Sequence, residues 1–124
     1  MTKERTFFSN CTPYAVRQYE TTQDGATVVI LDAQGGGGLE LICRPEIVDT
    51  PARPLPANEV GVRHFSFAVE NMAAVHSLLT SRGIVFTTEP RAPKIMKGAA
   101  LIAFCKDPEG NLVEFIEKKP ESIL

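Results

Sequence analysis

The chain has 124 residues, of which 44% are hydrophobic and 23% charged, and its formal net charge is -2. This length and composition are typical of one soluble globular domain with a single core. The near-neutral charge argues against nucleic acid as the main partner, and no apolar run reaches the roughly 20 residues that a membrane-spanning helix needs.

The three cysteines, Cys11, Cys43 and Cys105, are odd in number and widely spaced. Cys43 and Cys105 fall within apolar strand candidates, which indicates small buried side chains in a reducing compartment rather than a cysteine zinc site. Residues 1–5 do not lead into a signal-peptide core, so a cytoplasmic location is expected.

The first part of the chain predicts three consecutive strands. They cover residues 13–21, 27–33 and 38–44, and the glycine run Gly35–Gly38 joins the last two. A stretch with four prolines follows at 44–60 and predicts a surface linker.

The second part predicts the order strand, helix, strand, strand, strand. A strand at 61–70 precedes a helix at 72–82, which Asn71 caps and Gly83 ends. A loop at 89–98 and the tight turn Asp-Pro-Glu-Gly separate the three remaining strands, which cover residues 84–88, 99–105 and 111–117.

Two hairpins of the chain repeat each other. ILDAQGGGGLELI and FCKDPEGNLVEFI each contain a strand, an Asp, a glycine turn and a strand with one Glu between apolar residues. Glu40 and Glu114 occupy the matching positions and are separated by 74 residues (114 − 40). A Glu in such a strand is costly to bury without a partner, although an edge strand or a salt bridge would also accommodate it.

The repeat also indicates what the first unit lacks. His64 lies on the strand that opens the second unit, and the same offset places its counterpart before Met1. The chain is therefore expected to begin inside the first unit's helix, without that unit's first strand. A misassigned start codon or a truncated gene is the alternative explanation.

Strand alternation places His64 on the inner face of its strand. His64 shares a face with Ser66, whereas Phe65 and Phe67 lie on the other face and suit packing beneath a helix. A single histidine on a strand is most often only hydrogen-bonded, so a ligand role for His64 depends on the two carboxylates.

The segments GVRHFSFAVENMAAVHSLLTSRGI and AFCKDPEGNLVEFIE resemble the vicinal oxygen chelate superfamily, which includes glyoxalase I, extradiol dioxygenases, methylmalonyl-CoA epimerase and bleomycin- or fosfomycin-resistance proteins. The resemblance implies an α+β fold in which paired βαβββ modules form a cupped mixed sheet. It implies one glyoxalase-like domain over 1–124, with an abbreviated first module (1–43), a linker (44–60) and a second module (61–119).

The resemblance implies a divalent metal inside the cup. Such proteins take ligands from the first and last strands of each module, and His64, Glu40 and Glu114 occupy three of these four positions. Imidazole and carboxylate ligands suit Zn, Ni, Mn, Fe or Co, and three protein ligands leave room for a substrate. Glu114 and Glu40 are also the candidate catalytic residues.

The function that the resemblance implies is a glyoxalase-like enzyme of lyase or isomerase type, acting on a small vicinal-oxygen substrate. A metal that holds two vicinal oxygens stabilises an enediolate, so that a Glu can remove a carbon-bound proton. The alternatives are a metal-free dimeric ligand-binding protein of the bleomycin-resistance type and an extradiol-dioxygenase-like member. No nucleic-acid or membrane partner is expected.

A homodimer is expected because the strand that carries Glu40 lacks its usual neighbour. In the family's fold a module's first strand pairs with its last, so the missing strand leaves an open edge. Unpaired edges promote association, and a two-fold dimer closes both copies' edges at once. Residues 1–12 or the linker 44–60 are expected to help cap this edge.

Overall fold

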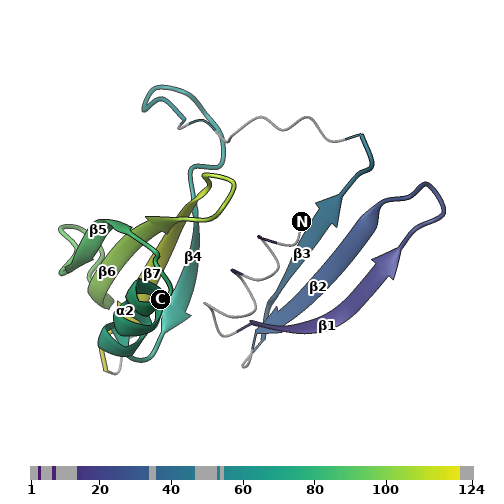
Figure 1. The fold of residues 1–124 in the computed structure, drawn as a ribbon. Coiled ribbons are helices and arrows are strands. Elements are labelled where there is room, and N and C mark those ends of the chain that lie inside the picture. Colours follow the sequence, from purple (N-terminus) through teal and green to yellow (C-terminus); the bar gives the residue numbers. More distant parts are fainter. Residues whose placement is uncertain are drawn as a thin grey trace. The chain divides into compact units, whose positions relative to one another are not determined.

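The computed structural model describes residues 3, 7, 14–33, 36–46, 53 and 55–120. These residues form one helix and seven strands in two sheets, which confirms the predicted α+β class (Figure 1). The chain divides into two compact units, Met1–Pro51 and Ala52–Leu124. In the described part of the chain, no helix is long and apolar enough to cross a membrane.

The first unit contains an antiparallel sheet in the order β1-β2-β3. Its strands are β1 (Tyr14–Thr21), β2 (Thr27–Ala33) and β3 (Gly38–Cys43). Val29 and Leu31 alternate along β2 and are fully buried. Among the strands of the described residues, β3 pairs only with β2. Most of residues 1–12 and 47–52 lie outside the described residues, so the capping of this edge stays a prediction.

The second unit is a βαβββ module, as predicted for 61–119. The sheet order is β4-β7-β6-β5, with β4 and β7 parallel and the other neighbours antiparallel. β7 therefore lies inside the sheet, between β4 and β6. The elements are β4 (Phe65–Val69), α2 (Met72–Ser81), β5 (Phe86–Arg91), β6 (Ala99–Lys106) and β7 (Leu112–Lys118).

The helix α2 begins at the predicted residue, Met72, and ends at Ser81, one residue before the predicted end. The Oδ1 atom of Asn71 accepts a hydrogen bond from Ala74 N at 3.0 Å, which satisfies one of the free amides of the first turn. Gly83 follows the helix with a φ of 81°, the left-handed conformation that glycine adopts most easily.

Large apolar side chains fill the space between α2 and one face of the sheet. Met72 and Leu79 of α2 are fully buried. The ring centroids of Phe67 on β4 and Phe115 on β7 lie 5.9 Å apart. At the start of α2, Met72 N donates to the carboxylate of Glu117 on β7 at 2.7 Å. The odd-numbered residues of β7 therefore face α2, and Glu114 faces the opposite side.

Two strands differ from the sequence-based prediction by more than one residue at an end. β4 begins at Phe65 rather than at residue 61, because its partner β7 begins at Leu112 and leaves the earlier residues without a strand neighbour. β5 runs on to Arg91 through Pro90, within the predicted loop 89–98. It is an edge strand with shifted register, the position at which a sheet tolerates a proline.

The two repeated hairpins have the same register. Glu40 pairs with Ile30 in β2–β3, and Glu114 pairs with Phe104 in β6–β7, so both members of the pair are displaced by 74 positions. Every other pair of the β2–β3 ladder, from Asp32 with Gly38 to Thr27 with Cys43, also has a counterpart 74 positions later in the β6–β7 ladder. The repeat proposed from sequence is therefore present in the strand pairing.

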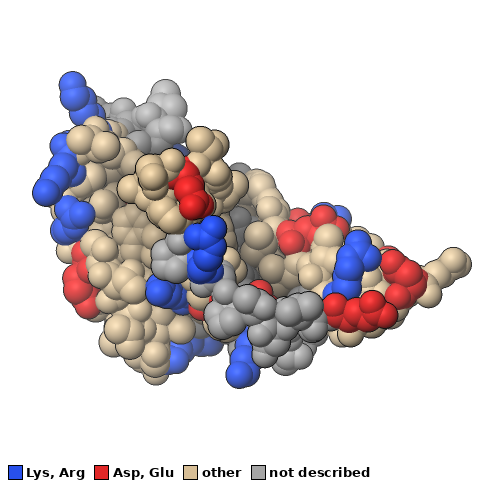
Figure 2. All heavy atoms as spheres, turned by 90° about the horizontal axis from the view of Figure 1, so that it is seen from above, with Lys and Arg blue, Asp and Glu red and all other residues tan. Residues whose placement is uncertain are grey.

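The surface carries charges of both signs. In the face shown in Figure 2, blue and red groups form small clusters separated by uncharged surface. Cys105 is fully buried, whereas Cys43 is only partly buried.

Candidate functional site

Glu114 lies at the centre of the candidate site. Glu114 lies on β7, which is flanked by β4 and β6. Only 5% of the Glu114 side chain is exposed. An ionised carboxylate at such a position requires hydrogen-bond donors, because burial removes its hydration. The donors must come from the face of the sheet opposite α2.

Two side chains supply these contacts, and both reach the same carboxylate oxygen. The Nε2 atom of His64 lies 3.0 Å from Glu114 Oε2, and the hydroxyl of Ser66 donates to Oε2 at 2.6 Å. Ser66 stands directly opposite Glu114 in the β4–β7 register. No hydrogen-bond partner of the second oxygen, Oε1, occurs among the described residues.

His64 is held from two sides. Besides its contact with Glu114, its ring meets the ring of Phe104 edge to face, with the centroids 5.2 Å apart. Phe104 is the residue that pairs with Glu114 across β6–β7. A third of the His64 side chain, 34%, remains exposed, so the imidazole borders both the buried carboxylate and the surface.

The contact between His64 and Glu114 suits two ligands of one divalent ion. Their donor atoms are 3.0 Å apart, and metal–ligand bonds of about 2.1 Å at right angles place neighbouring donors about 3 Å apart. Glu114 Oε1, which is free in the described structure, adds another donor. His64 and Glu114 therefore fit a divalent cation as a partial ligand set.

The third predicted ligand, Glu40, lies on β3 of the first unit, where its side chain is exposed. Its convergence with His64 and Glu114 concerns two separate units and stays a prediction. Within the described residues, no group of three or more His, Cys, Asp or Glu side chains is arranged to hold a metal ion. Of the three predicted ligands, the second unit carries His64 and Glu114.

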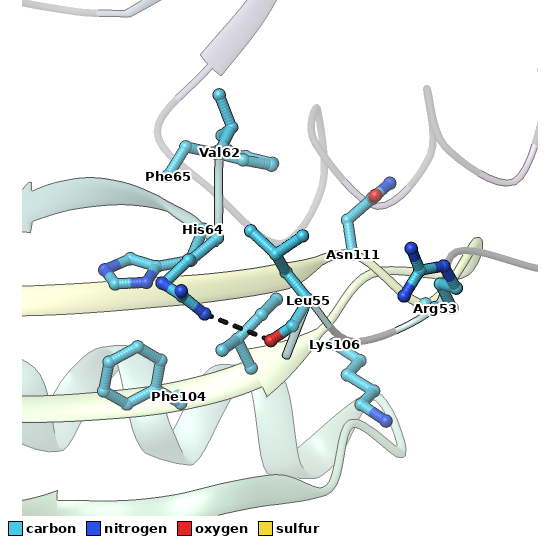
Figure 3. A pocket seen from close by; sticks show the side chains of 11 residues that line it. Arg53, Leu55, Val62, His64, Phe65, Phe104, Lys106 and Asn111 are labelled. Carbon is cyan, nitrogen blue, oxygen red and sulfur yellow. Dashed lines mark hydrogen bonds between the residues drawn. The ribbon is translucent and has the colours of Figure 1, made fainter. Parts of the chain in front are cut away.

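A pocket of about 350 Å³ lies next to this pair (Figure 3). Its volume is at the lower end of the range for small-molecule sites. Aliphatic and aromatic side chains make much of the wall, with several basic groups and no acidic one. The lining residues are Arg53, Leu55, Val62, Arg63, His64, Phe65, Phe104, Lys106, Gly110, Asn111 and Leu112.

Arg63 builds one side of this pocket. Its guanidinium donates to the carbonyl of Leu55 at 3.1 Å, a bond drawn in Figure 3, and to that of Glu59 at 2.8 Å. It also donates to the carbonyls of Pro56 and Ala57, each at 3.1 Å. These bonds tie the end of the predicted linker to the residue before His64.

The β6–β7 turn forms the adjoining part of the wall. Asp107 is 6% exposed, and its Oδ1 accepts from Glu109 N at 3.0 Å and from Asn111 N at 2.7 Å. Its Oδ2 accepts from the Asn111 side chain at 2.9 Å. The buried Asp107 therefore fixes Asn111 and Leu112 at the pocket and has a structural role.

The second histidine, His76, lies in a different environment. Its Nε2 is 2.6 Å from a carboxylate oxygen of Glu89, and its ring stacks on Phe86 with the centroids 4.7 Å apart. These contacts join α2 to β5 on the helical side of the sheet. His76 therefore packs the helix and does not belong to the candidate site.

The comparisons with known proteins agree with this architecture. The sequence model of the Glyoxalase/Bleomycin resistance protein/Dioxygenase superfamily matches residues 7–115. The chain belongs to this superfamily. No curated protein matches the chain significantly.

Solved structures of the superfamily have the same fold. A glyoxylase/bleomycin resistance protein/dioxygenase domain from Frankia sp. EAN1pec superposes with a TM-score of 0.78 at 14% identity, covering 96% of this chain and 89% of that one. A glyoxalase family protein from Enterococcus faecalis gives 0.73 at 23% identity, with coverages of 94% and 88%. Glyoxalase I from Zea mays gives 0.71 at 18% identity, and the match covers 94% of this chain and 42% of that enzyme.

Proposed function

We propose that this superfamily member is a glyoxalase-like, metal-dependent enzyme of lyase or isomerase type that acts on a small vicinal-oxygen substrate. The observation that carries the proposal is the buried carboxylate of Glu114, which shares one oxygen between His64 and Ser66 and leaves the other free. A buried charge with an unused oxygen, next to a pocket, is suited to binding a ligand.

In the proposed site His64 and Glu114 hold a divalent metal, and Glu40 supplies the third ligand, either from the same chain or across a dimer. Ions that accept imidazole and carboxylate ligands include Zn, Ni, Mn, Fe and Co. When bound, the metal would supply a Lewis acid that polarises the vicinal oxygens of the substrate.

The protein's own residues would divide the remaining tasks. One of the carboxylates, Glu114 or Glu40, would accept the carbon-bound proton, since a carboxylate in a partly dry site is a competent general base. Ser66 would hold Glu114 by its short hydrogen bond. Phe104 would orient the His64 ring and keep water from one side of the carboxylate.

The decisive experiment measures metal content and proton exchange together. Protein stripped on a chelating resin is incubated with each of the five ions and its bound metal is counted by mass spectrometry. The loaded protein is then mixed with an α-hydroxycarbonyl compound in deuterated water. We expect one tight ion per site and deuterium wash-in at the carbon next to the carbonyl, with both lost in Glu114→Gln.

A metal-free ligand-binding protein is the second candidate function. The contact of His64 with Glu114 favours this candidate, because each side chain already gives the other a hydrogen-bond partner without an ion. An absence of tight binding for every ion, together with saturable binding of a small molecule in the pocket, would support this candidate over the enzyme. An extradiol-dioxygenase-like activity would require a second histidine ligand.

We place this site in a homodimer in the cytoplasm. The single strand partner of β3 among the described strands supports the dimer.

A further inference from the structure

The proposed reaction assigns no role to the charged side chains around the pocket. Three lining side chains, Arg53, Arg63 and Lys106, are basic, and none of the lining residues is acidic. Two nearby carboxylates already accept hydrogen bonds from other groups. Asp107 accepts from the turn amides, and Glu114 accepts from His64 and Ser66.

Two of the cations have no carboxylate partner among the described residues. The acceptors of Arg63 are all backbone carbonyls, which are neutral, so its positive charge is fixed in place but not compensated. Lys106 has no ion pair or hydrogen bond with another described side chain. Arg53 is paired only at 3.4 Å, with the half-exposed Glu59.

Two of the cations, Arg53 and Lys106, lie at the end of the pocket opposite the candidate reactive groups. Figure 3 shows His64 and Phe104 at one end and Arg53 and Lys106 toward the other, with Leu55 between them. Lys106 follows Phe104 by two positions on β6 and therefore lies on the same face of the sheet. The wall between the two ends is largely apolar.

We infer that the pocket binds an elongated small molecule with an apolar body and an anionic end, most simply a carboxylate. The anion lies against Lys106 and Arg53, and the body lies along Leu55 and Leu112. The other end of the molecule reaches His64. This inference names the class of substrate that the site binds. It rests on the proposed function only for the reaction at the His64 end of the pocket.

The test uses two probes of the same size and shape, phenylpropionate and its uncharged amide, phenylpropionamide. Both are titrated at low salt into protein stripped of metal on a chelating resin, and binding is followed by amide chemical shifts in heteronuclear NMR spectra. The carboxylate should bind about fivefold to tenfold more tightly than the amide, because a charge-assisted contact adds to the same apolar burial. The shifts should concentrate at residues 62–64 and 104–112.

Two variants locate the anion. Lys106→Met keeps the length of the side chain and should bring the two affinities within about twofold of each other, without weakening the amide. Lys94→Met, in the exposed loop before β6, changes the net charge equally and should leave the preference intact. High salt should weaken the carboxylate alone.

Equal affinities in the native protein, shifts that map elsewhere, or an unchanged preference in Lys106→Met would each overturn the inference. These outcomes are independent of the metal titration. Tight metal binding without anion preference would leave the proposed function standing, whereas anion preference without metal binding would leave this inference standing.

Discussion

Ser66 Oγ lies 2.6 Å from Glu114 Oε2, across the parallel pair β4–β7. This hydrogen bond and the contact from His64 converge on a single oxygen, so the carboxylate is fixed in orientation and Oε1 is left without a partner among the described residues. The serine thus determines which oxygen of the buried carboxylate is available to a ligand.

Ser66→Ala should lower the free energy of unfolding by about 1–3 kcal/mol, because one donor to a buried charged acceptor is lost. Urea denaturation of the metal-free protein measures the change. Ser77→Ala, on the exposed side of α2, serves as the matched control and should change stability by less than about 0.5 kcal/mol. Equal effects of the two substitutions would show that the Ser66 bond contributes nothing.

His64→Ala should abolish stoichiometric metal binding and leave the protein folded. The imidazole is one of the two proposed ligands on the second unit. The His64 side chain is partly exposed, so its loss leaves no large cavity. Metal content and circular dichroism are measured on the same samples. His76→Ala, which removes the histidine bound to Glu89, should retain the metal; retention by His64→Ala would exclude the assigned site.

Asp107→Ala should destabilise the protein by about 2–4 kcal/mol, because three donors at a buried turn lose their charged acceptor. Asp107→Asn should cost less, since one amide oxygen can still accept from the backbone. Thermal unfolding of the two variants should rank them in this order. A loss below about 0.5 kcal/mol in Asp107→Ala would contradict the structural role of the turn.

Arg63→Met should release the loop 55–60 without unfolding the sheet. Four carbonyls of this loop share the guanidinium, and a methionine provides no donor for them. We expect faster cleavage in this loop during limited proteolysis, with little change in the unfolding midpoint. Arg82→Met, beyond the end of α2, is the control and should be cut at the native rate.

The protein should sediment as a homodimer at micromolar concentration. β3 carries Glu40 and has one strand neighbour among the described strands, so its second edge needs a cover. Sedimentation equilibrium should give twice the chain mass of 13.5 kDa. A monomer at that concentration would show the edge argument to be wrong.

The positions of Glu114 and His64 could be predicted from sequence because strand alternation has only two outcomes. Alternation places Phe65 and Phe67 on the face opposite His64. The ring of Phe67 indeed lies near Phe115, whereas Phe65 also borders the pocket. The hairpin repeat likewise gave the register of Glu114. The proposed ligand role of Glu40 depends on how two units meet, which no local pattern specifies.

Ser66 and Arg63 were missed as functional residues for different reasons. A serine in a strand is ordinary, and only the pairing of β4 with β7 reveals that it stands opposite Glu114. Arg63 bonds to backbone carbonyls, which every residue has, so no sequence pattern marks its partners.

The interior position of β7 has a consequence for how the protein comes apart. Glu114 lies on a strand with neighbours on both sides. The loop 55–60, which brings Leu55 to the pocket, is held chiefly by the side chain of Arg63. Amides of β7 should therefore exchange with solvent only when the whole unit opens, while those of the loop exchange through local fluctuations. Under mild heating or denaturant, the wall of the pocket would therefore open before the sheet unfolds.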